Sequence, residues 1–220
     1  MKLAIFISGR GSNMVALLDY ACQDDVPITP VLVLADGPAP GLDLAASRGV
    51  DTLALPRDDF ASKAEHEAAI IAAVDAAGAE MIALAGYMRL LSADFCARFR
   101  DRIINIHPSL LPRHKGLDTH RRALEAGDAS HGCSVHLVTP GMDEGPVLAQ
   151  ASVPVLSEDT PETLAARVLG REHVIYPLVL GALAAGRLTI SSSGSDNNPG
   201  PVPGVIGGAA NRVWPPAEDI

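Results

Sequence analysis

The chain has 220 residues, of which 48% are hydrophobic and 20% are charged. This composition predicts one folded domain with a substantial core, because a disordered chain carries far fewer apolar residues. The 17 basic residues against 26 acidic ones give a net charge of −9, which argues against a nucleic-acid or anionic-membrane binder.

The cysteines are 3 in number, scattered, and without a Cys-X-X-Cys pair. This argues against a disulfide framework or a structural zinc site and favours a reducing compartment. The first apolar run stops at Ser8, too early for a signal peptide. Charged residues or proline interrupt every later apolar run, so none is long enough to span a bilayer. We therefore expect a cytoplasmic protein without a membrane segment.

The first half of the chain alternates short apolar runs with longer amphipathic ones. Continuous apolar character is typical of strands that are buried on both faces, as in a parallel sheet. The alternation predicts right-handed strand–helix–strand units and a doubly wound α/β sheet that is mostly parallel and flanked by helices. The expected strands are Leu3–Ile7, Pro30–Ala35, Thr52–Leu55, Met81–Ala85 and Ile103–Ile106, and the expected helices are Asn13–Cys22, Leu42–Arg48, Ser62–Ala77 and Ser92–Phe99.

The pattern changes after Pro108, where residues 109–118 are predicted to form an ordered loop. Thr160 followed by Pro161 is a strong helix start, because threonine caps the first turn and proline fits its first position. An antiparallel strand pair in this half makes the expected sheet mixed at its edge. The elements expected here are a helix at Thr119–Ala126, the strands Cys133–Val138 and Val147–Val153, and a helix kinked at Pro177 that ends near Gly186.

From Ser191 onward proline, glycine, serine and asparagine dominate. Such a composition buries too little apolar surface to fold, so a mostly disordered tail is predicted over residues 191–220. The folded domain is therefore expected to cover residues 1–190.

A glycine-rich turn, Ser8–Asn13, connects the first expected strand to the first helix. Its two glycines allow a tight turn, and the helix N-terminus offers free N–H groups to a phosphate. The turn matches neither the dinucleotide fingerprint nor the Walker loop. Phosphate binding and ordinary helix capping both remain open for this turn.

Asn105 and His107 are two polar residues in an apolar strand. They share one face, because side chains alternate along a strand, and ligands bind at the carboxyl ends of such strands. Asparagine can donate to a developing oxyanion, and histidine can move a proton near neutral pH. Asp143 lies in a later turn, where a carboxylate would orient an imidazole if it reached one. The residues alone leave open whether Asn105 and His107 are simply satisfied by the backbone and whether Asp143 is only a turn residue.

Six segments stand in the same order as in the glycinamide ribonucleotide formyltransferases, which this chain resembles from about Lys2 to Ile190. These segments are SGRGSN, AGYMRLL, NIHPSLLP, GLDTHRRALEAGD, HGCSVHLVTPGMDEGPVLAQ and REHVIYPLV. The resemblance implies a formyltransferase catalytic domain over residues 1–190 with a Rossmann-like N-terminal half. It also implies formyl transfer from 10-formyltetrahydrofolate to the amine of glycinamide ribonucleotide in purine biosynthesis.

Asn105, His107 and Asp143 match the family's catalytic positions. The resemblance implies that His107, protonated and positioned by Asp143, stabilises a tetrahedral oxyanion and takes part in proton transfer to the leaving folate nitrogen. Asn105 would donate a further hydrogen bond to this oxyanion. No metal and no covalent acyl-enzyme are expected.

The family's binding positions also match residues of this chain. For three of these residues a role without ligand binding is equally open: Met88 and Leu91 could be core residues, and Lys63 could be a solvated charge at the start of a helix. The ribonucleotide set is Gly11, Ser12 and Asn13 for the phosphate, Glu172 for the ribose hydroxyls, and Leu169, Gly170 and Arg171 before it. The folate set is Lys63 for the glutamate tail, with Met88, Arg89, Leu90, Leu91, Asn105, Thr139, Pro140, Gly141, Met142 and Asp143.

The loop at residues 113–118 departs from the family pattern, which commonly has Tyr-Pro before its glycine and histidine after its leucine. Here His114, Lys115 and Asp118 stand at those positions, while His120 is retained. We expect this change to alter loop closure or pH dependence without removing the reaction.

Three other functions share some of these features. Methionyl-tRNA formyltransferase carries an extra C-terminal β domain, which the short tail does not supply, and the net charge does not suit tRNA. Formyltetrahydrofolate hydrolase carries an N-terminal regulatory domain, whereas the expected fold begins at Met1. A silent nucleotide-binding protein has no need of Asn105, His107 and Asp143 together. We therefore expect small-molecule substrates, no nucleic-acid or membrane partner, and a monomer or homodimer.

Overall fold

The computed structural model describes residues 1–190 and the pair Val213–Trp214. The chain divides into two compact units, Met1–Asn105 and Ile106–Ile220. In the sequence, the boundary between them falls inside one strand, β5 (Ile103–His107).

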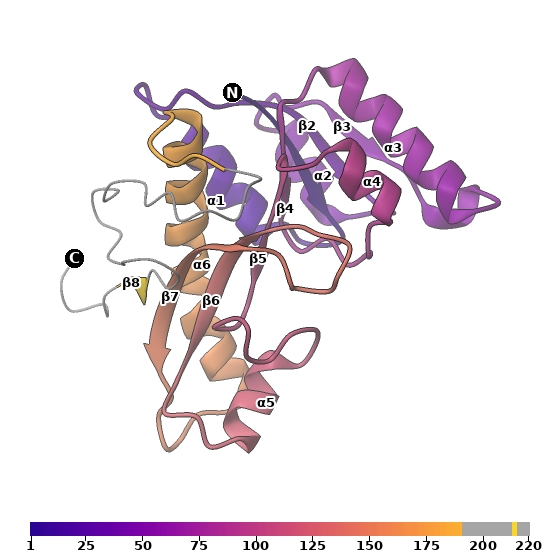
Figure 1. Cartoon of the computed structure of the whole chain (residues 1–220). Coiled ribbons are helices and arrows are strands. Elements are labelled where there is room, and N and C mark those ends of the chain that lie inside the picture. The colour runs from indigo at the N-terminus through magenta and orange to yellow at the C-terminus, as the bar shows by residue number, and fades with distance from the viewer. Residues whose placement is uncertain (191–212, 215–220) are drawn as a thin grey trace. The chain divides into compact units, whose positions relative to one another are not determined.

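The first unit is built on a parallel sheet with the strand order β3-β2-β1-β4-β5 (Figure 1). Every residue from Leu3 to Ile7 in its central strand is fully buried, as the continuous apolar runs predicted. The order reverses between β1 and β4, which is the point where doubly wound sheets bind ligands beyond the carboxyl ends of their strands. The strands are β1 (Lys2–Ile7), β2 (Thr29–Ala35), β3 (Thr52–Ala54), β4 (Met81–Leu84) and β5.

Two helices of the first unit, α3 and α4, begin where the sequence places capping residues. The side chain of Ser62 accepts a hydrogen bond from the Glu65 amide, and Ser92 does the same for Phe95. The predicted boundaries are confirmed to within two residues, except that the 3-10 turn was not predicted. The elements are α1 (Ser12–Ala21), α2 (Pro40–Ala46), the 3-10 turn η1 (Arg57–Asp59), α3 (Lys63–Ala77) and α4 (Ala93–Arg98).

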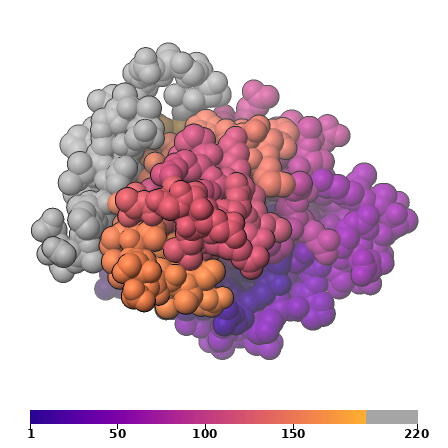
Figure 2. Space-filling view, turned by 90° about the horizontal axis from the view of Figure 1, so that it is seen from below, coloured from indigo at the N-terminus to yellow at the C-terminus, as the bar shows by residue number. Residues whose placement is uncertain are grey.

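The second unit packs one long helix against an antiparallel strand pair. Strands β6 (Ser130–Leu137) and β7 (Val147–Pro154) are antiparallel, and the long helix α6 (Pro161–Ala184) contacts both. Thr160 caps α6 through a reciprocal pair of hydrogen bonds with Thr163, and Pro161 is its first residue, as predicted. The short helix α5 (Thr119–Glu125) packs beside α6 on the face shown in Figure 2.

The mostly parallel sheet flanked by helices, mixed through the antiparallel pair, confirms the fold expected from the sequence. A short strand β8 (Val213–Trp214) pairs in parallel with β7. The rest of the predicted tail, and with it the boundary near Ser191, lies outside the described residues. Among the helices described, none is long and apolar enough to cross a membrane.

Candidate active site

The carboxyl end of β5 carries the two polar residues that the sequence singled out. Asn105 is partly buried, and His107 is only 6% exposed. They stand two positions apart in one strand, so their side chains leave the same face. The Ser109 amide donates to the His107 carbonyl over 2.9 Å and turns the chain directly after the strand.

Asp143 reaches His107, which the sequence alone could not show. Its Oδ2 lies 3.4 Å from Nδ1 of His107 and also accepts a hydrogen bond of 2.9 Å from the Gly116 amide. Asp143 belongs to the turn between β6 and β7 and has a left-handed backbone, with φ of 51°. The structure thus brings a buried imidazole and a largely buried carboxylate together at the end of a strand.

A second imidazole, that of His136, lies near the same carboxylate, with Nε2 at 3.6 Å from Oδ1 of Asp143. Burial lowers the pKa of His136, against the opposing effects of the Leu137 carbonyl and Asp143. Its Nδ1 lies 2.8 Å from that carbonyl and carries the proton of the neutral ring. A neutral His136 therefore has no proton on Nε2 for Asp143, and His107 is the imidazole that can donate to the carboxylate.

The loop at residues 109–118 is ordered, as predicted, and a buried polar network fixes its first half. The Ser134 hydroxyl donates to the Ser109 carbonyl over 2.6 Å and accepts from the Leu111 amide over 3.0 Å. The side-chain Nε2 of Gln150 donates to the Leu111 carbonyl over 2.9 Å and to the Ser134 hydroxyl over 2.8 Å. Strands β6 and β7 thereby hold the segment that follows His107.

The second half of the loop is fixed by its own charges. Nε2 of His114 lies 2.7 Å from Oδ2 of Asp128, and Arg113 pairs with the other oxygen of that carboxylate. The carbonyl of His114 lies 3.1 Å from Nε2 of His107. The loop therefore touches the ring nitrogen of His107 that does not face Asp143.

Three further imidazoles gather beside this loop. The ring centre of His131 lies 5.1 Å from that of His120 and 5.9 Å from that of His114. Burial, followed by the nearby His120 and His114, lowers the pKa of His131 to about 4. Burial also lowers the pKa of His120, with a smaller effect from His107. His120 and His131 are therefore neutral near pH 7.

The glycine-rich turn of the first unit leaves the N-terminus of α1 accessible to a ligand. Gly11 precedes the helix with φ of 74°, and no side chain caps the first turn. Gly41 of α2 packs against the turn so closely that a Cβ there would lie 2.6 Å from Cδ1 of Ile7 and 2.9 Å from the Gly9 carbonyl. The predicted phosphate residues Gly11, Ser12 and Asn13 thus have the backbone arrangement that suits an anion.

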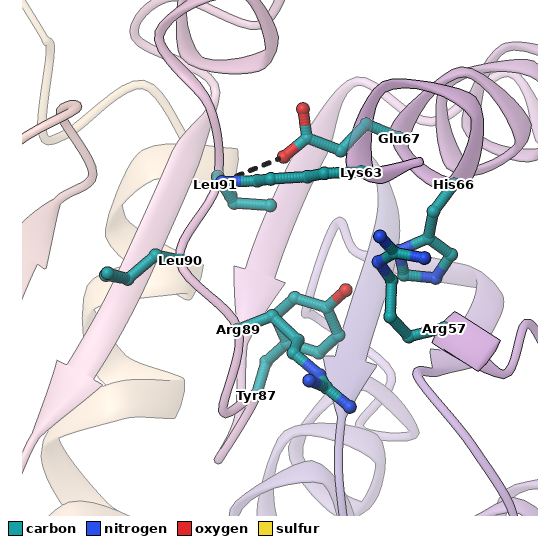
Figure 3. A pocket seen from close by; sticks show the side chains of 8 residues that line it. All are labelled: Arg57, Lys63, His66, Glu67, Tyr87, Arg89, Leu90 and Leu91. Atoms are coloured by element: carbon teal, nitrogen blue, oxygen red, sulfur yellow. Dashed lines mark ion pairs between the residues drawn. The ribbon is translucent and has the colours of Figure 1, made fainter. Parts of the chain in front are cut away.

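A pocket of about 270 Å³ opens in the first unit, and Figure 3 shows the side chains that line it. Four of the predicted folate residues line it, whereas Met88 does not and is 64% exposed. The sequence missed the other four, although Glu67, one helical turn after Lys63, was a usable signal. The lining residues are Lys63, Arg89, Leu90 and Leu91, which were predicted, and Arg57, His66, Glu67 and Tyr87.

The charges around this pocket are partly paired. Nζ of Lys63 lies 3.7 Å from the buried Glu67 carboxylate, which also accepts hydrogen bonds from the Ser92 amide and hydroxyl. Nε of Arg89 lies 2.6 Å from Oδ2 of Asp36. Burial, with a smaller effect from Asp36, raises the pKa of Tyr87, so its hydroxyl stays neutral. The pocket therefore offers cationic side chains, a phenol and the apolar side chains of Leu90 and Leu91.

The remaining predicted residues lie in two segments of the second unit. One segment is the turn that leads to Asp143, where Met142 is 49% exposed. The other lies inside α6, where Glu172 is buried. These residues are Thr139, Pro140, Gly141 and Met142 in the turn, and Leu169, Gly170, Arg171 and Glu172 in the helix. Within the described part of the chain, no group of three or more His, Cys, Asp or Glu side chains could hold a metal ion.

Comparison with known proteins identifies the class to which this fold and site belong. The formyl transferase family matches residues 1–180. The chain therefore belongs to the formyl transferase family, and it is an enzyme of that class.

The similar proteins narrow the class further. The phosphoribosylglycinamide formyltransferase of Escherichia coli is 42% identical over 189 residues, which cover 86% of this chain and 89% of that protein. The crystal structure of the phosphoribosylglycinamide formyltransferase from Brucella melitensis is 54% identical, with a TM-score of 0.81 over 86% of this chain and 98% of the other. The human trifunctional purine biosynthetic protein adenosine-3 is 36% identical over 194 residues, only 19% of its length. The resemblance to the glycinamide ribonucleotide formyltransferases is thereby confirmed.

Proposed function

We propose that this enzyme transfers the formyl group of 10-formyltetrahydrofolate to the amine of glycinamide ribonucleotide in purine biosynthesis. The observation that carries the proposal is the contact of Asp143 with His107 at the end of β5, in a chain whose relatives are named for this transfer. The donor is a co-substrate that leaves as tetrahydrofolate.

The reaction needs a proton donor and a partner for negative charge. The amine nitrogen of the ribonucleotide attacks the formyl carbon, a C–N bond forms, and the carbonyl electrons move to oxygen. The tetrahedral oxyanion then collapses, the bond to N10 of the folate breaks, and N10 takes up a proton while the new amide nitrogen loses one. His107, held by Asp143, donates to the oxyanion and mediates this proton transfer, and Asn105 donates a second hydrogen bond.

The binding roles follow the chemistry of each segment. The N–H groups at the start of α1, where Gly11 provides no side-chain cap, suit the ribonucleotide phosphate, and the buried carboxylate of Glu172 suits the ribose hydroxyls. The pocket of the first unit suits the folate. Its apolar residues would contact the pterin, and Lys63 would face the glutamate carboxylate.

The composition of the chain supports the expected compartment and partners. The three cysteines are free, which supports a reducing compartment such as the cytoplasm. The acidic net charge of −9 supports small-molecule partners rather than nucleic acid. A monomer or a homodimer remains the expected state.

An absorbance assay for the folate product tests this function. Purified protein is mixed with 10-formyltetrahydrofolate, with and without the ribonucleotide, beside the His107→Ala and Asp143→Asn variants. We expect turnover only with the ribonucleotide, and a loss of about 100-fold or more in kcat for each variant, because transition-state stabilisation is removed. Turnover without the ribonucleotide would indicate a hydrolase instead. Tight folate binding without turnover would indicate a silent binding protein.

A further inference from the structure

The two ring nitrogens of His107 both face acceptors. Nδ1 lies 3.4 Å from the Asp143 carboxylate, and Nε2 lies 3.1 Å from the His114 carbonyl. We propose that His114 is a positioning residue: its carbonyl caps the catalytic nitrogen of His107, and its ring, bound to Asp128, holds the cap in place. This inference rests on the proposed function, because the capped nitrogen is the one that would donate to the formyl oxygen.

The cap competes with the substrate because the two acceptors are alike. Asp143 occupies the space at Nδ1, so Nε2 is the nitrogen left for the formyl oxygen. A backbone carbonyl and a formyl carbonyl are both sp² oxygens that accept a hydrogen bond in the same geometry. The donor must therefore displace the His114 carbonyl before His107 can act on it.

The ring of His114 fixes where its carbonyl points. His114 has a left-handed backbone with φ of 51°, which a non-glycine residue keeps only where its surroundings impose it. Nε2 lies 2.7 Å from the Asp128 carboxylate, and both side chains are largely buried, at 12% and 6% exposed. Such a shielded, charge-assisted bond is stronger than an exposed one.

The rest of the loop does not depend on this bond. Ser134 and Gln150 hold the segment at residues 109–111 through their own buried hydrogen bonds. Loss of the bond between His114 and Asp128 therefore releases the cap without releasing the base of the loop.

The cap has a kinetic signature that separates it from a general structural role. A donor that binds only the uncapped protein has an apparent dissociation constant equal to its intrinsic constant divided by the fraction of protein that is uncapped. Once the donor is bound the cap is displaced, so kcat does not depend on it. Weakening the bond between His114 and Asp128 should lower KM for the formyl donor and leave kcat unchanged. A general disturbance of the site would instead raise KM or lower kcat.

Two substitutions at the same position give a matched pair. His114→Phe keeps a ring against His131 and removes the hydrogen bond to Asp128. His114→Gln keeps an N–H donor for Asp128. Asp128→Asn weakens the same bond by removing its charge, together with the ion pair to Arg113, and serves as a second releasing variant if His114→Phe folds poorly.

The test combines steady-state kinetics with NMR of the Nε2 proton of His107 in protein without substrates. For His114→Phe we expect KM for 10-formyltetrahydrofolate to fall by about 3- to 10-fold with kcat within about 2-fold, and the proton to exchange with water about 10-fold faster. Asp128→Asn should shift KM and exchange in the same directions, and His114→Gln should match the wild type in both. Unchanged exchange in His114→Phe, or a raised KM, would overturn the proposal. Because the exchange measurement needs no turnover, it still decides whether the cap exists if formyl transfer itself is not found.

Discussion

Asp143 has two histidine neighbours, and burial distinguishes between them. The pKa of His136 is lowered by burial, and its Nδ1 faces the Leu137 carbonyl, so that ring is a neutral neighbour of the carboxylate. His107 faces an acceptor at each nitrogen, and only a doubly protonated ring donates to both. The two imidazoles beside Asp143 thus differ in which of their nitrogens face an acceptor.

The imidazole of His131 makes a testable contribution to stability. Its pKa is about 4 in the folded protein, against about 6.5 for an ordinary histidine in the unfolded chain. Between these pH values the unfolded state binds more protons than the folded state. The contribution of His131 to stability is therefore fully present above pH 6.5 and is lost as the pH falls toward 4. We expect protonation of this residue to lower the free energy of unfolding by about 1 kcal/mol between pH 7 and pH 5, after allowance for solvent screening.

Denaturant unfolding at pH 7 and pH 5 measures this effect in the wild type and in His131→Gln. The variant should lose less stability across the interval than the wild type. A remaining loss is expected, because burial also lowers the pKa of His120, His136 and His173. Equal losses in the two proteins would show that His131 does not titrate in this way.

Helix α2 packs closely against the glycine-rich turn that forms the candidate phosphate site of the first unit. A Cβ on Gly41 would lie 2.6 Å from Ile7 and 2.9 Å from the Gly9 carbonyl, so Gly41→Ala must push α2 and the turn apart. We expect a loss of about 1–3 kcal/mol in unfolding free energy, and roughly 10-fold weaker ribonucleotide binding.

Gly37→Ala is the matched control, because nothing lies within 4 Å of the Cβ it would add. Denaturant unfolding and calorimetric titration with the ribonucleotide should leave Gly37→Ala close to the wild type. If Gly41→Ala kept full affinity for the ribonucleotide, the turn would not be the phosphate site.

Most elements were predictable because their signals are local. Apolar runs fixed the strands, and Ser62, Ser92 and Thr160 with Pro161 marked helix starts that the structure confirms. The pocket was only half predictable, because its lining comes from η1, α3 and the segment after β4, which are separate in sequence. The contact between His107 and Asp143 and the left-handed backbone of His114 arise from tertiary packing, which no local pattern encodes.

The net charge of the chain and the charge beside the pocket of the first unit differ in sign. The chain carries a net charge of −9, yet Arg57, Lys63 and Arg89 line one pocket. Glu67 and Asp36 pair with two of these three cations, so a single positive charge remains beside the pocket. A local field of this kind can attract an anionic ligand even on an acidic protein, because surface potentials follow the nearest charges. An acidic chain is therefore compatible with the anionic substrates that we propose.

The most direct test follows the formyl carbon itself. Protein is mixed with 10-formyltetrahydrofolate carrying ¹³C in the formyl group and with glycinamide ribonucleotide, and ¹³C NMR records where the label goes. We expect an N-formyl signal on the ribonucleotide amine, formed by the wild type and not by His107→Ala, without release of formate. A label that appears as free formate, at the same rate with or without the ribonucleotide, would contradict it.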